Sequence, residues 1–551
     1  MKSEEKFETF FWEGISPTLG FAPRYPGYKP RAKVDRERGI ICEYDVAVNM
    51  RDGIKIYSDI FRPEKEGRYP ALIAWGPYGK HTPFSDASHP ASGVAPSDMS
   101  EYCAFEAPDP VYWCPHGYVI INVDPRGAWG SEGVLTFMTE QEAEDCYDLI
   151  EWVAKQPWSN GKVGMAGVSY LAWTQWRVAA LNPPHLAAIS PWEGVSDFYR
   201  EFAFHGGIPS NLFLWLLARE AFCCSNSRRV EDLVRMAKEH PLFDDYWASK
   251  NADLTRITVP AFIVASWSDH GLHTRGTLEA FKKIASTDKY LLIHGRKKWQ
   301  FFRQMVDLQK QFFDRYLKGV DNNEVKYWPK VRLEVRERYY FGNFRSENEW
   351  PLARTQYTKL FLNADGTLTN NPPKKENSIC YDAKTGTTQF EYKFNDKTEL
   401  TGYMKLKLWV QAKGSDDIDL FIAIEKYDRA GDFVRFPHTV LMYDYAPAAL
   451  GWLRVSHREL DEEKSMPYQP VLKHQRELKL KLGEIVPIEI EIWPSSILFE
   501  RGEKLRLVVQ GRDILTYAAF GHTETVNKGE HIMYMGGKYD SHLLMPVIPI
   551  A

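Results

Sequence analysis

Short, continuously apolar runs alternate with stretches of helical periodicity through much of the first 320 residues of the chain. The runs have the length and character of buried parallel strands, and they lie at residues 69–75, 118–123, 163–166, 186–190, 260–266 and 290–294. Between the second and third runs, Ala143, Tyr147, Ile150 and Ala154 recur at helical spacing. Repeated strand–helix units of this kind predict a mostly parallel sheet covered by helices.

Two segments depart from this alternation. Residues 198–256 show helical patterns only, with the apolar run 212–217 at their centre, and we interpret them as an inserted helical cap that roofs the site. A membrane-docking helix is the alternative, but Arg219 and Glu220 follow the run at once and disfavour it. After Lys326, short alternating segments separated by Gly, Asp and Asn predict an antiparallel sandwich.

The chain has 551 residues, too many for one hydrophobic core, so several domains are expected. Residues 44–60 alternate around Asp52-Gly53, a strong hairpin signal, whereas the residues before them are rich in Pro, Gly and aromatics. The predicted units are an N-terminal arm (1–40), a parallel-sheet core (41–197 and 257–325), the cap (198–256) and a β-sandwich (326–551).

Composition and charge argue against several classes of function. The chain is 44% hydrophobic and 26% charged with a formal charge of −4, and it has no basic stripe of the kind that binds nucleic acid. Its first residues are charged on both signs, unlike a signal peptide, and no apolar run approaches the ~18 residues that span a bilayer. Seven scattered cysteines indicate reduced thiols in a cytoplasmic protein. No spacing typical of a zinc site or a phosphate loop occurs, so no metal or cofactor is predicted.

One serine lies at a sharp turn between a predicted strand and a predicted helix. The apolar run 163–166 leads into Gly167-Val168-Ser169-Tyr170, and a helix-like stretch follows at once. Such a turn presents the serine hydroxyl with the N-terminus of the next helix behind it. The usual pattern is G-x-S-x-G, and Leu171 stands at its last position, so an ordinary serine in a βα turn is the alternative interpretation.

Further candidate groups follow the ends of other predicted strands. Acyl transfer by serine needs a nucleophile, a base, an acid that orients the base, and donors for the oxyanion. Parallel sheets build their crevice at the carboxyl ends of their strands, where Tyr78, Asp269 and His294 lie. The order Ser…Asp…His is also that of α/β-hydrolases. The sequence therefore predicts a serine hydrolase site.

Several longer stretches carry a family resemblance. They are Gly76–Lys80, Asp124–Gly127 with Ser131–Gly133, Glu144-Asp145 with Gln156–Trp158, Asn160–Tyr170, Phe312–Leu317 and Glu399–Gly402. Together they resemble the cocaine-esterase-like (CocE/NonD) hydrolases, which share a fold with X-Pro dipeptidyl peptidases (peptidase family S15) and α-amino-acid ester hydrolases. The resemblance covers nearly the whole chain after residue 40.

The resemblance implies an α/β-hydrolase core, an inserted helical cap and a C-terminal all-β jelly-roll (galactose-binding-like) sandwich. It also implies that Ser169 is the nucleophile and that the Tyr78 hydroxyl and the Tyr170 amide are the oxyanion donors.

The general base departs from the family pattern. Members place the histidine a few residues past the last strand, in a Gly-Pro-Trp-x-His type of loop, but here the loop reads His294-Gly-Arg-Lys-Lys-Trp299. We predict that His294, earlier in this loop, is the base and that Asp269 orients it. His273 is the alternative base and His270 a weaker one. If His273 is the base, Glu193 becomes the more attractive acid.

The predicted activity is hydrolysis of the ester, or else amide, bond of a small acyl substrate through an acyl-enzyme. An aromatic content of 14% favours apolar pockets, and the aromatic residues of the predicted cap favour a bulky, partly apolar acyl group. An X-Pro dipeptidyl peptidase is the first alternative, although no motif locates an acidic group for the substrate's ammonium. A non-catalytic binding protein on a hydrolase scaffold is the second. The expected partner is a small ester or short peptide-like molecule, not nucleic acid or a membrane, and a homodimer is left open.

Overall fold

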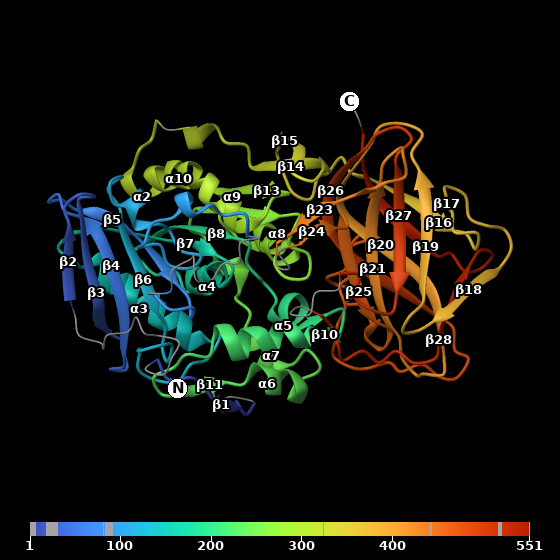
Figure 1. Cartoon of the computed structure of the whole chain (residues 1–551), viewed down its shortest axis with the longest axis horizontal. Helices are drawn as coiled ribbons and strands as arrows, with labels where there is room; N and C mark the ends of the chain where they lie inside the picture. Colours follow the sequence, from blue (N-terminus) through green and yellow to red (C-terminus); the bar gives the residue numbers. More distant parts are fainter. Residues whose placement is uncertain are drawn as a thin grey trace.

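The computed structural model describes residues 7–17, 31–80, 82, 92–322, 324–439, 443–515 and 521–549. One extended sheet forms the first half of the molecule, drawn from blue to yellow-green in Figure 1. Its strand order is β2 (Arg31–Asp35), β3 (Ile40–Asn49), β4 (Lys55–Pro63), β6 (Val119–Asp124), β5 (Tyr69–Trp75), β7 (Ser159–Val168), β8 (Leu186–Trp192), β12 (Ala261–Ser266), β13 (Lys289–His294), β14 (Val331–Arg338) and β15 (Phe341–Glu347).

The centre of this sheet, from β6 to β14, is parallel, and its two ends are antiparallel. Each apolar run of the first half forms one of the parallel strands, because a strand covered on both faces needs apolar residues throughout. The hairpin at Asp52-Gly53 is confirmed by the antiparallel register of β3 and β4. The carboxyl ends of β5, β7, β8, β12 and β13 therefore lie along one edge of the sheet.

Helices pack on this sheet (Figure 1). The predicted helix is α3 (Glu140–Ala154), which begins where the Thr139 side chain accepts a hydrogen bond from the Glu142 N–H. Its periodic apolar face is buried against the sheet. The other helices of this half are α2 (Pro110–Trp113), α4 (Tyr170–Ala179), α8 (Thr274–Lys283), α9 (Lys298–Gln304) and α10 (Val306–Lys318).

The core sheet continues past residue 326, where the sequence placed the start of the sandwich. β14 pairs in parallel with β13, and β15 pairs antiparallel with β14. β15 is partly exposed along most of its length. An edge hairpin with one solvated face alternates in the same way as a sandwich strand, so its sequence pattern could not assign it to the core.

The inserted segment, residues 198–256, lies below the core in Figure 1, beside the C-terminal domain. It contains α5 (Asn211–Leu216), α6 (Leu233–Glu239) and α7 (Asp245–Ser249). The helix-only prediction is wrong in one respect, because the segment also contains the short strands β9 (Phe204–His205), β10 (Ile208–Pro209) and β11 (Arg229–Glu231). β11 pairs with β1 (Phe11–Glu13), so its partner comes from the N-terminal arm, far away in sequence.

The C-terminal domain is built almost entirely of antiparallel strands, orange to red in Figure 1. One sheet joins β26 (Val486–Phe499), β20 (Thr398–Lys413), β29 (His542–Ile548), β28 (Glu530–Met535), β16 (Gln356–Leu362) and β18 (Asn377–Asp382). The other joins β19 (Thr387–Lys393), β27 (Lys504–Gln510), β21 (Asp419–Tyr427) and β25 (Ala449–Arg454). Apolar side chains from both sheets share one core. The alternating segments predicted after Lys326 lie within these strands.

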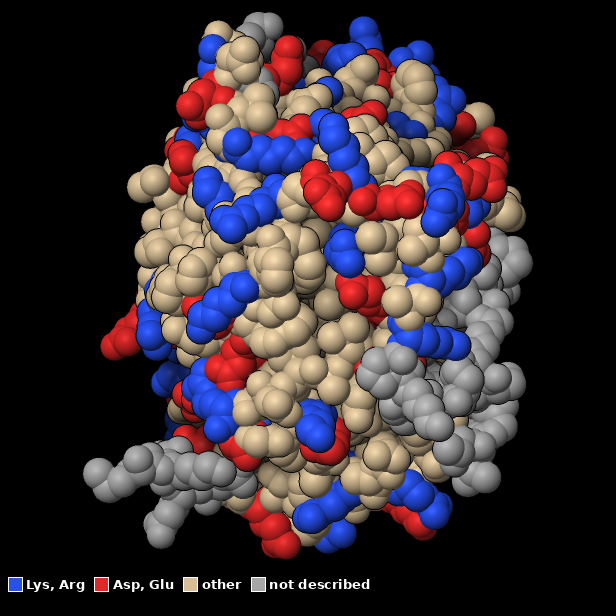
Figure 2. Space-filling view, turned by 90° about the vertical axis from the view of Figure 1, so that its left-hand side faces the viewer, with Lys and Arg blue, Asp and Glu red and all other residues tan. Residues whose placement is uncertain are grey.

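Charges of both signs are interspersed over the face shown in Figure 2, with no region of a single sign. Within the described ranges, no helix combines the length and the apolar character needed to cross a membrane. The seven cysteines all fall in these ranges, and all are free thiols.

Candidate active site

Ser169 occupies the turn between β7 and α4 with a backbone φ of 58°, a left-handed value that is strained for a residue with a side chain. Its N–H donates to the Trp192 carbonyl at the end of β8, 3.0 Å away, which holds the turn against the next strand. The serine side chain is only 7% exposed. This is the strand-to-helix turn that the sequence pattern predicted.

Leu171 explains the missing final glycine of the motif. A Cβ on Gly167 would lie 2.5 Å from Leu171 Cβ, and a Cβ on Gly76 would lie 2.5 Å from Leu171 Cδ1. The leucine is buried and fills the space beside the two glycines. The space for this leucine is therefore left by the first glycine of the motif, Gly167, and by Gly76, which follows β5.

His273, and not His294, contacts the serine. The Ser169 Oγ lies 3.1 Å from His273 Nε2, and His273 Nδ1 hydrogen bonds with Asp269 Oδ2. His273 and Asp269 belong to one loop between β12 and α8, and the Asp269 carbonyl accepts the His273 N–H at 3.1 Å. Both side chains are fully buried. The structure thus brings together a hydroxyl, an imidazole and a carboxylate in the order that acyl transfer requires.

The charges of this group are set by burial and by a neighbouring cation. Burial lowers the pKa of His273 to about 4, the Lys298 ammonium acts in the same direction, and Asp269 opposes both. Burial alone would raise the pKa of Asp269, but the Lys298 charge and His273 hold it below its usual range. At neutral pH the histidine is therefore uncharged and can accept a proton, while Asp269 is ionised.

His294 lies at the end of β13, as predicted, but it faces another carboxyl group. Its Nε2 donates to Glu193 Oε1 at 3.1 Å, and its Nδ1 accepts the Arg296 N–H at 3.1 Å. Both ring nitrogens are thus occupied, and the predicted contact of His294 with Ser169 is not formed. His270 likewise accepts the Leu450 N–H through Nδ1, 3.0 Å away, and contacts the Pro494 carbonyl through Nε2.

Glu193 stands beside Asp269 and not in its place. Burial, followed by the charge of Asp269, raises the pKa of Glu193 well above its usual range. The protonated form of its carboxyl is therefore favoured, and that proton can bridge the two acids. Asp269 is the acid on the His273 side, and Glu193 joins it to His294.

Tyr78 and the Tyr170 amide converge near the serine, as predicted. The Tyr78 hydroxyl lies close enough to the Ser169 side chain, the Glu106 carboxyl and the Tyr170 N–H for all three to affect its pKa. Burial and the nearby charge of Glu106 raise that pKa well above its usual range, so the hydroxyl keeps its proton. The Tyr170 side chain points elsewhere and donates to Glu142, 3.0 Å away. One O–H donor and one N–H donor thus lie near Ser169.

Two buried charged residues beside this site, Lys298 and Glu106, were not predicted from the sequence. Lys298 Nζ lies 3.4 Å from Asp269 Oδ2 and 3.2 Å from His273 Nδ1. Burial raises the pKa of Glu106 to about 7 against the opposing charge of Lys298, and its Oε1 accepts the Trp299 indole N–H at 2.8 Å. Lys298 could have been found, because it lies in the loop where the family places a histidine. Glu106 lies in an irregular segment that carries no such signal.

One group in the described part of the chain has the spacing of a metal site. The ligand atoms of Glu193, Asp269 and His273 lie within 4.8 Å of one another. However, His273 Nδ1 already donates to Asp269, and the Lys298 ammonium lies 3.4 Å from the same carboxylate. A second cation there would meet the charge of Lys298 at close range, so we interpret these residues as a hydrogen-bonded network and not as metal ligands.

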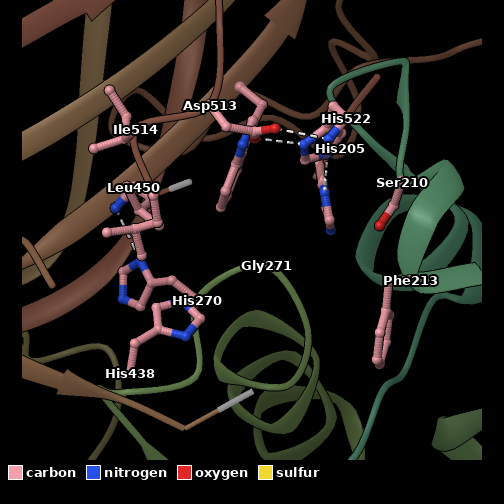
Figure 3. A pocket seen from close by; sticks show the side chains of 12 residues that line it. His205, Ser210, Phe213, His270, Gly271, His438, Leu450, Asp513, Ile514 and His522 are labelled. Atoms are coloured by element: carbon pink, nitrogen blue, oxygen red, sulfur yellow. Dashed lines mark hydrogen bonds and ion pairs between the residues drawn. The ribbon is translucent and has the colours of Figure 1, made fainter. Parts of the chain in front are cut away.

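A pocket open to solvent is lined in part by His270 and Gly271 of the loop that carries Asp269 and His273. In Figure 3, His205 and Phe213 of the inserted segment face His270 and His438 across it. The His205 ring contacts His522 of the C-terminal domain, with 2.7 Å between Nδ1 and Nε2. All three parts of the molecule therefore contribute to its wall.

Two protein-family models match the chain. The one described as X-Pro dipeptidyl-peptidase (S15 family) matches residues 52–298, and the one described as X-Pro dipeptidyl-peptidase C-terminal non-catalytic domain matches residues 323–544. A CocE/NonD family hydrolase from Staphylococcus aureus, known as a crystal structure, is 47% identical with a TM-score of 0.88, over 93% of this chain and 94% of that one.

Two curated proteins are more distant relatives. The cocaine esterase of Rhodococcus sp. (strain MB1 Bresler) is 24% identical over 92% of this chain and 98% of that protein. The Xaa-Pro dipeptidyl-peptidase of Ligilactobacillus salivarius (strain UCC118) is 22% identical over 79% of this chain and 62% of that protein. The relatives thus include proteins named for ester and for peptide substrates.

Proposed function

Since this chain belongs to the CocE/NonD family of hydrolases, we propose that it cleaves carboxylic esters through an acyl-enzyme formed on Ser169. The observation that carries the proposal is the contact series from Ser169 Oγ through His273 to Asp269, buried at the edge of the sheet. His273 is the general base in this proposal, Asp269 orients it, and Tyr78 and the Tyr170 amide are the oxyanion donors.

Proton transfer follows the hydrogen bonds. Ser169 Oγ attacks the ester carbonyl as its proton moves to His273 Nε2, 3.1 Å away. His273 keeps its Nδ1–H, which donates to Asp269, and this hydrogen bond fixes the tautomer and stabilises the imidazolium that forms. The imidazolium then returns the proton to the leaving alcohol. Water, deprotonated by the same histidine, releases the acid and restores Ser169.

The oxyanion of each tetrahedral intermediate is stabilised by fixed donors. The Tyr78 O–H and the Tyr170 N–H both lie near the Ser169 side chain, so we expect little reorganisation when charge develops. Removing one donor of this kind typically costs about 3 kcal/mol of transition-state stabilisation. We expect Tyr78→Phe to lower kcat with little effect on KM.

Aromatic side chains around the site support a bulky, partly apolar acyl group. The Tyr78 ring packs on Phe105 and on Phe222 of the inserted segment, with centroids 4.9 and 5.3 Å apart. Trp173 lies 5.8 Å from the His273 ring. We propose that the inserted segment acts as a cap over the acyl group and that the cavity in Figure 3 receives part of the substrate.

A fluorophosphonate probe, which mimics the tetrahedral intermediate, tests the proposal. Labelling of the wild type and its loss in Ser169→Ala, together with loss of aryl-ester hydrolysis, are the expected results. The exposed Ser97 provides a matched control, because Ser97→Ala should keep both labelling and turnover. A wild type that is inert to the probe and to esters would contradict the proposal and favour a binding protein on this scaffold.

A dipeptidyl peptidase is the second candidate, supported by the S15 match over residues 52–298. A dipeptidyl peptidase has to bind the free ammonium group at the N-terminus of its substrate, whereas an esterase does not. The turnover of an X-Pro anilide and of a short aryl ester should be compared by kcat/KM. We expect the ester to be favoured by several orders of magnitude, and the opposite ratio would assign the peptidase.

A further inference from the structure

Lys298 reaches the catalytic group from α9, outside the loop that carries Asp269 and His273. Its side chain is 3% exposed, and Nζ lies 3.4 Å from Asp269 Oδ2. We propose that Lys298 is a positioning residue that holds the Asp269 carboxylate in place and keeps His273 unprotonated, as a base, in acidic solution. This inference rests on the proposed function, since it assigns His273 the role of base.

The Lys298 ammonium lies at contact distance from the His273 ring. Lys298 Nζ lies 3.2 Å from His273 Nδ1, so an imidazolium at His273 would be a like charge at contact distance. Asp269 Oδ2 faces both the imidazole and the ammonium. The attraction of Asp269 for an imidazolium is therefore opposed at close range by the charge of Lys298. The protonated resting form of His273 is therefore disfavoured, in the direction that burial already acts.

Other titratable groups around His273 contribute little charge. The buried titratable groups that interact with Asp269 or Lys298 include two acids and two histidines: Glu193, Glu106, His294 and His438. Burial holds both histidines neutral, and it raises the pKa of both acids. Below about pH 6, Lys298 and Asp269 are thus the two charges that decide the protonation of His273. The remaining contact of the ring is the uncharged Trp173.

The place of Lys298 in the chain agrees with this role. The stretch 294–299 is the loop in which the sequence pattern led us to expect the base. The structure instead places a cation there, directed at the acid, while the base comes from the Asp269 loop. The backbone of Lys298 is also held, because its N–H donates to Thr439 Oγ1 at 3.4 Å. The ammonium therefore approaches the pair from a defined position.

Profiles of kcat/KM against pH test the proposal on an aryl ester. Lys298→Met should shift the acid limb to higher pH by at least about one unit, because the imidazolium loses its repulsive neighbour. Lys298→Arg, which keeps the charge, should leave the limb near its wild-type position. Lys297→Met is the matched control: this lysine is also buried but pairs with Asp444 at 2.7 Å, and the limb should not move. Superimposable profiles for wild type and Lys298→Met would overturn the proposal.

A direct titration separates this proposal from the function itself. The imidazole signal of His273, assigned with His273→Asn in ring-labelled protein, should titrate at lower pH in the wild type than in Lys298→Met. Lys298→Gln replaces Lys298→Met if the latter does not fold, as judged by circular dichroism. A shift in this signal without any ester turnover would refute the esterase and keep the role of Lys298. Turnover with an unshifted signal would refute the role of Lys298 and keep the esterase.

Discussion

At the scale of single residues, the assignment of the base depends on which ring nitrogens are free. His294 and His273 are both buried near strand ends, but His294 uses Nε2 for Glu193 and Nδ1 for the Arg296 N–H. His273 directs Nε2 at the serine. A strand-end position can be predicted from the sequence, whereas the partners of each nitrogen depend on contacts between distant segments.

Substitution of the two histidines distinguishes their roles. His273→Ala should lower kcat by about 10⁴-fold or more, as the loss of a triad base does. His294→Ala should retain most of the activity, since this residue contacts Glu193 and not Ser169. Steady-state kinetics on folded protein check both expectations. Equal losses in the two variants would show that the Glu193–His294 pair is needed to hold Asp269.

The acid limb of the pH profile follows from the state of His273. Burial lowers its pKa to about 4, so the neutral base persists well into the acidic range. We expect kcat/KM to be level above about pH 5 and to fall tenfold per unit as pH drops below about 4, because protonation removes the base. The free-enzyme profile of an ester with a pH-stable leaving group measures this. A limb near pH 6.5 would indicate an ordinary, solvated histidine.

At the scale of elements, the turn around Ser169 was well predicted and its departure from the usual motif has a packing explanation. Gly167 and Gly76 leave room that Leu171 fills. The parallel strands were also predicted well, because a strand buried on both faces is continuously apolar. The short strands of the inserted segment were not, because β11 depends on pairing with β1, more than two hundred residues away in sequence. Local periodicity carries no signal for such a pair.

Restoring the usual motif should harm the protein. Leu171→Gly recreates G-x-S-x-G but removes a buried side chain from the first turn of α4 and adds a glycine to a helix. Together these changes should lower the free energy of unfolding by about 3–5 kcal/mol. Urea denaturation measures the change. Unchanged stability would mean that the segments carrying Gly76 and Gly167 collapse around the space.

At the scale of the whole molecule, one arginine joins the three parts of the chain. Arg275 of α8 donates from Nη1 to Glu201 in the inserted segment at 2.7 Å and from Nε to Glu491 of β26 at 2.9 Å. All three residues are largely removed from solvent, and Arg275 is only 6% exposed. The parallel core and the antiparallel C-terminal domain were predicted from their patterns, but a link of this kind depends on side chains that meet only in the folded chain.

Loss of this arginine should destabilise all three parts together. Arg275→Met leaves Glu201 and Glu491 without their cation, and breaking a buried ion pair from one side typically costs about 3–5 kcal/mol. Calorimetry should show a lower Tm, and the exposed Arg256→Met should stay close to wild type. An unchanged Tm for Arg275→Met would show that the interface does not depend on this charge.

The shared loop of Asp269 and His273 has a consequence for how this enzyme can change. Acid and base are four positions apart on one connection, so a single segment supplies both side chains. That stretch supplies Lys298, which faces the pair from outside. One segment thus supplies the acid and the base, and another supplies the lysine that we propose sets the pH range of activity. We expect a substitution at Lys298 alone to shift that pH range while the nucleophile, the base and the acid themselves are retained.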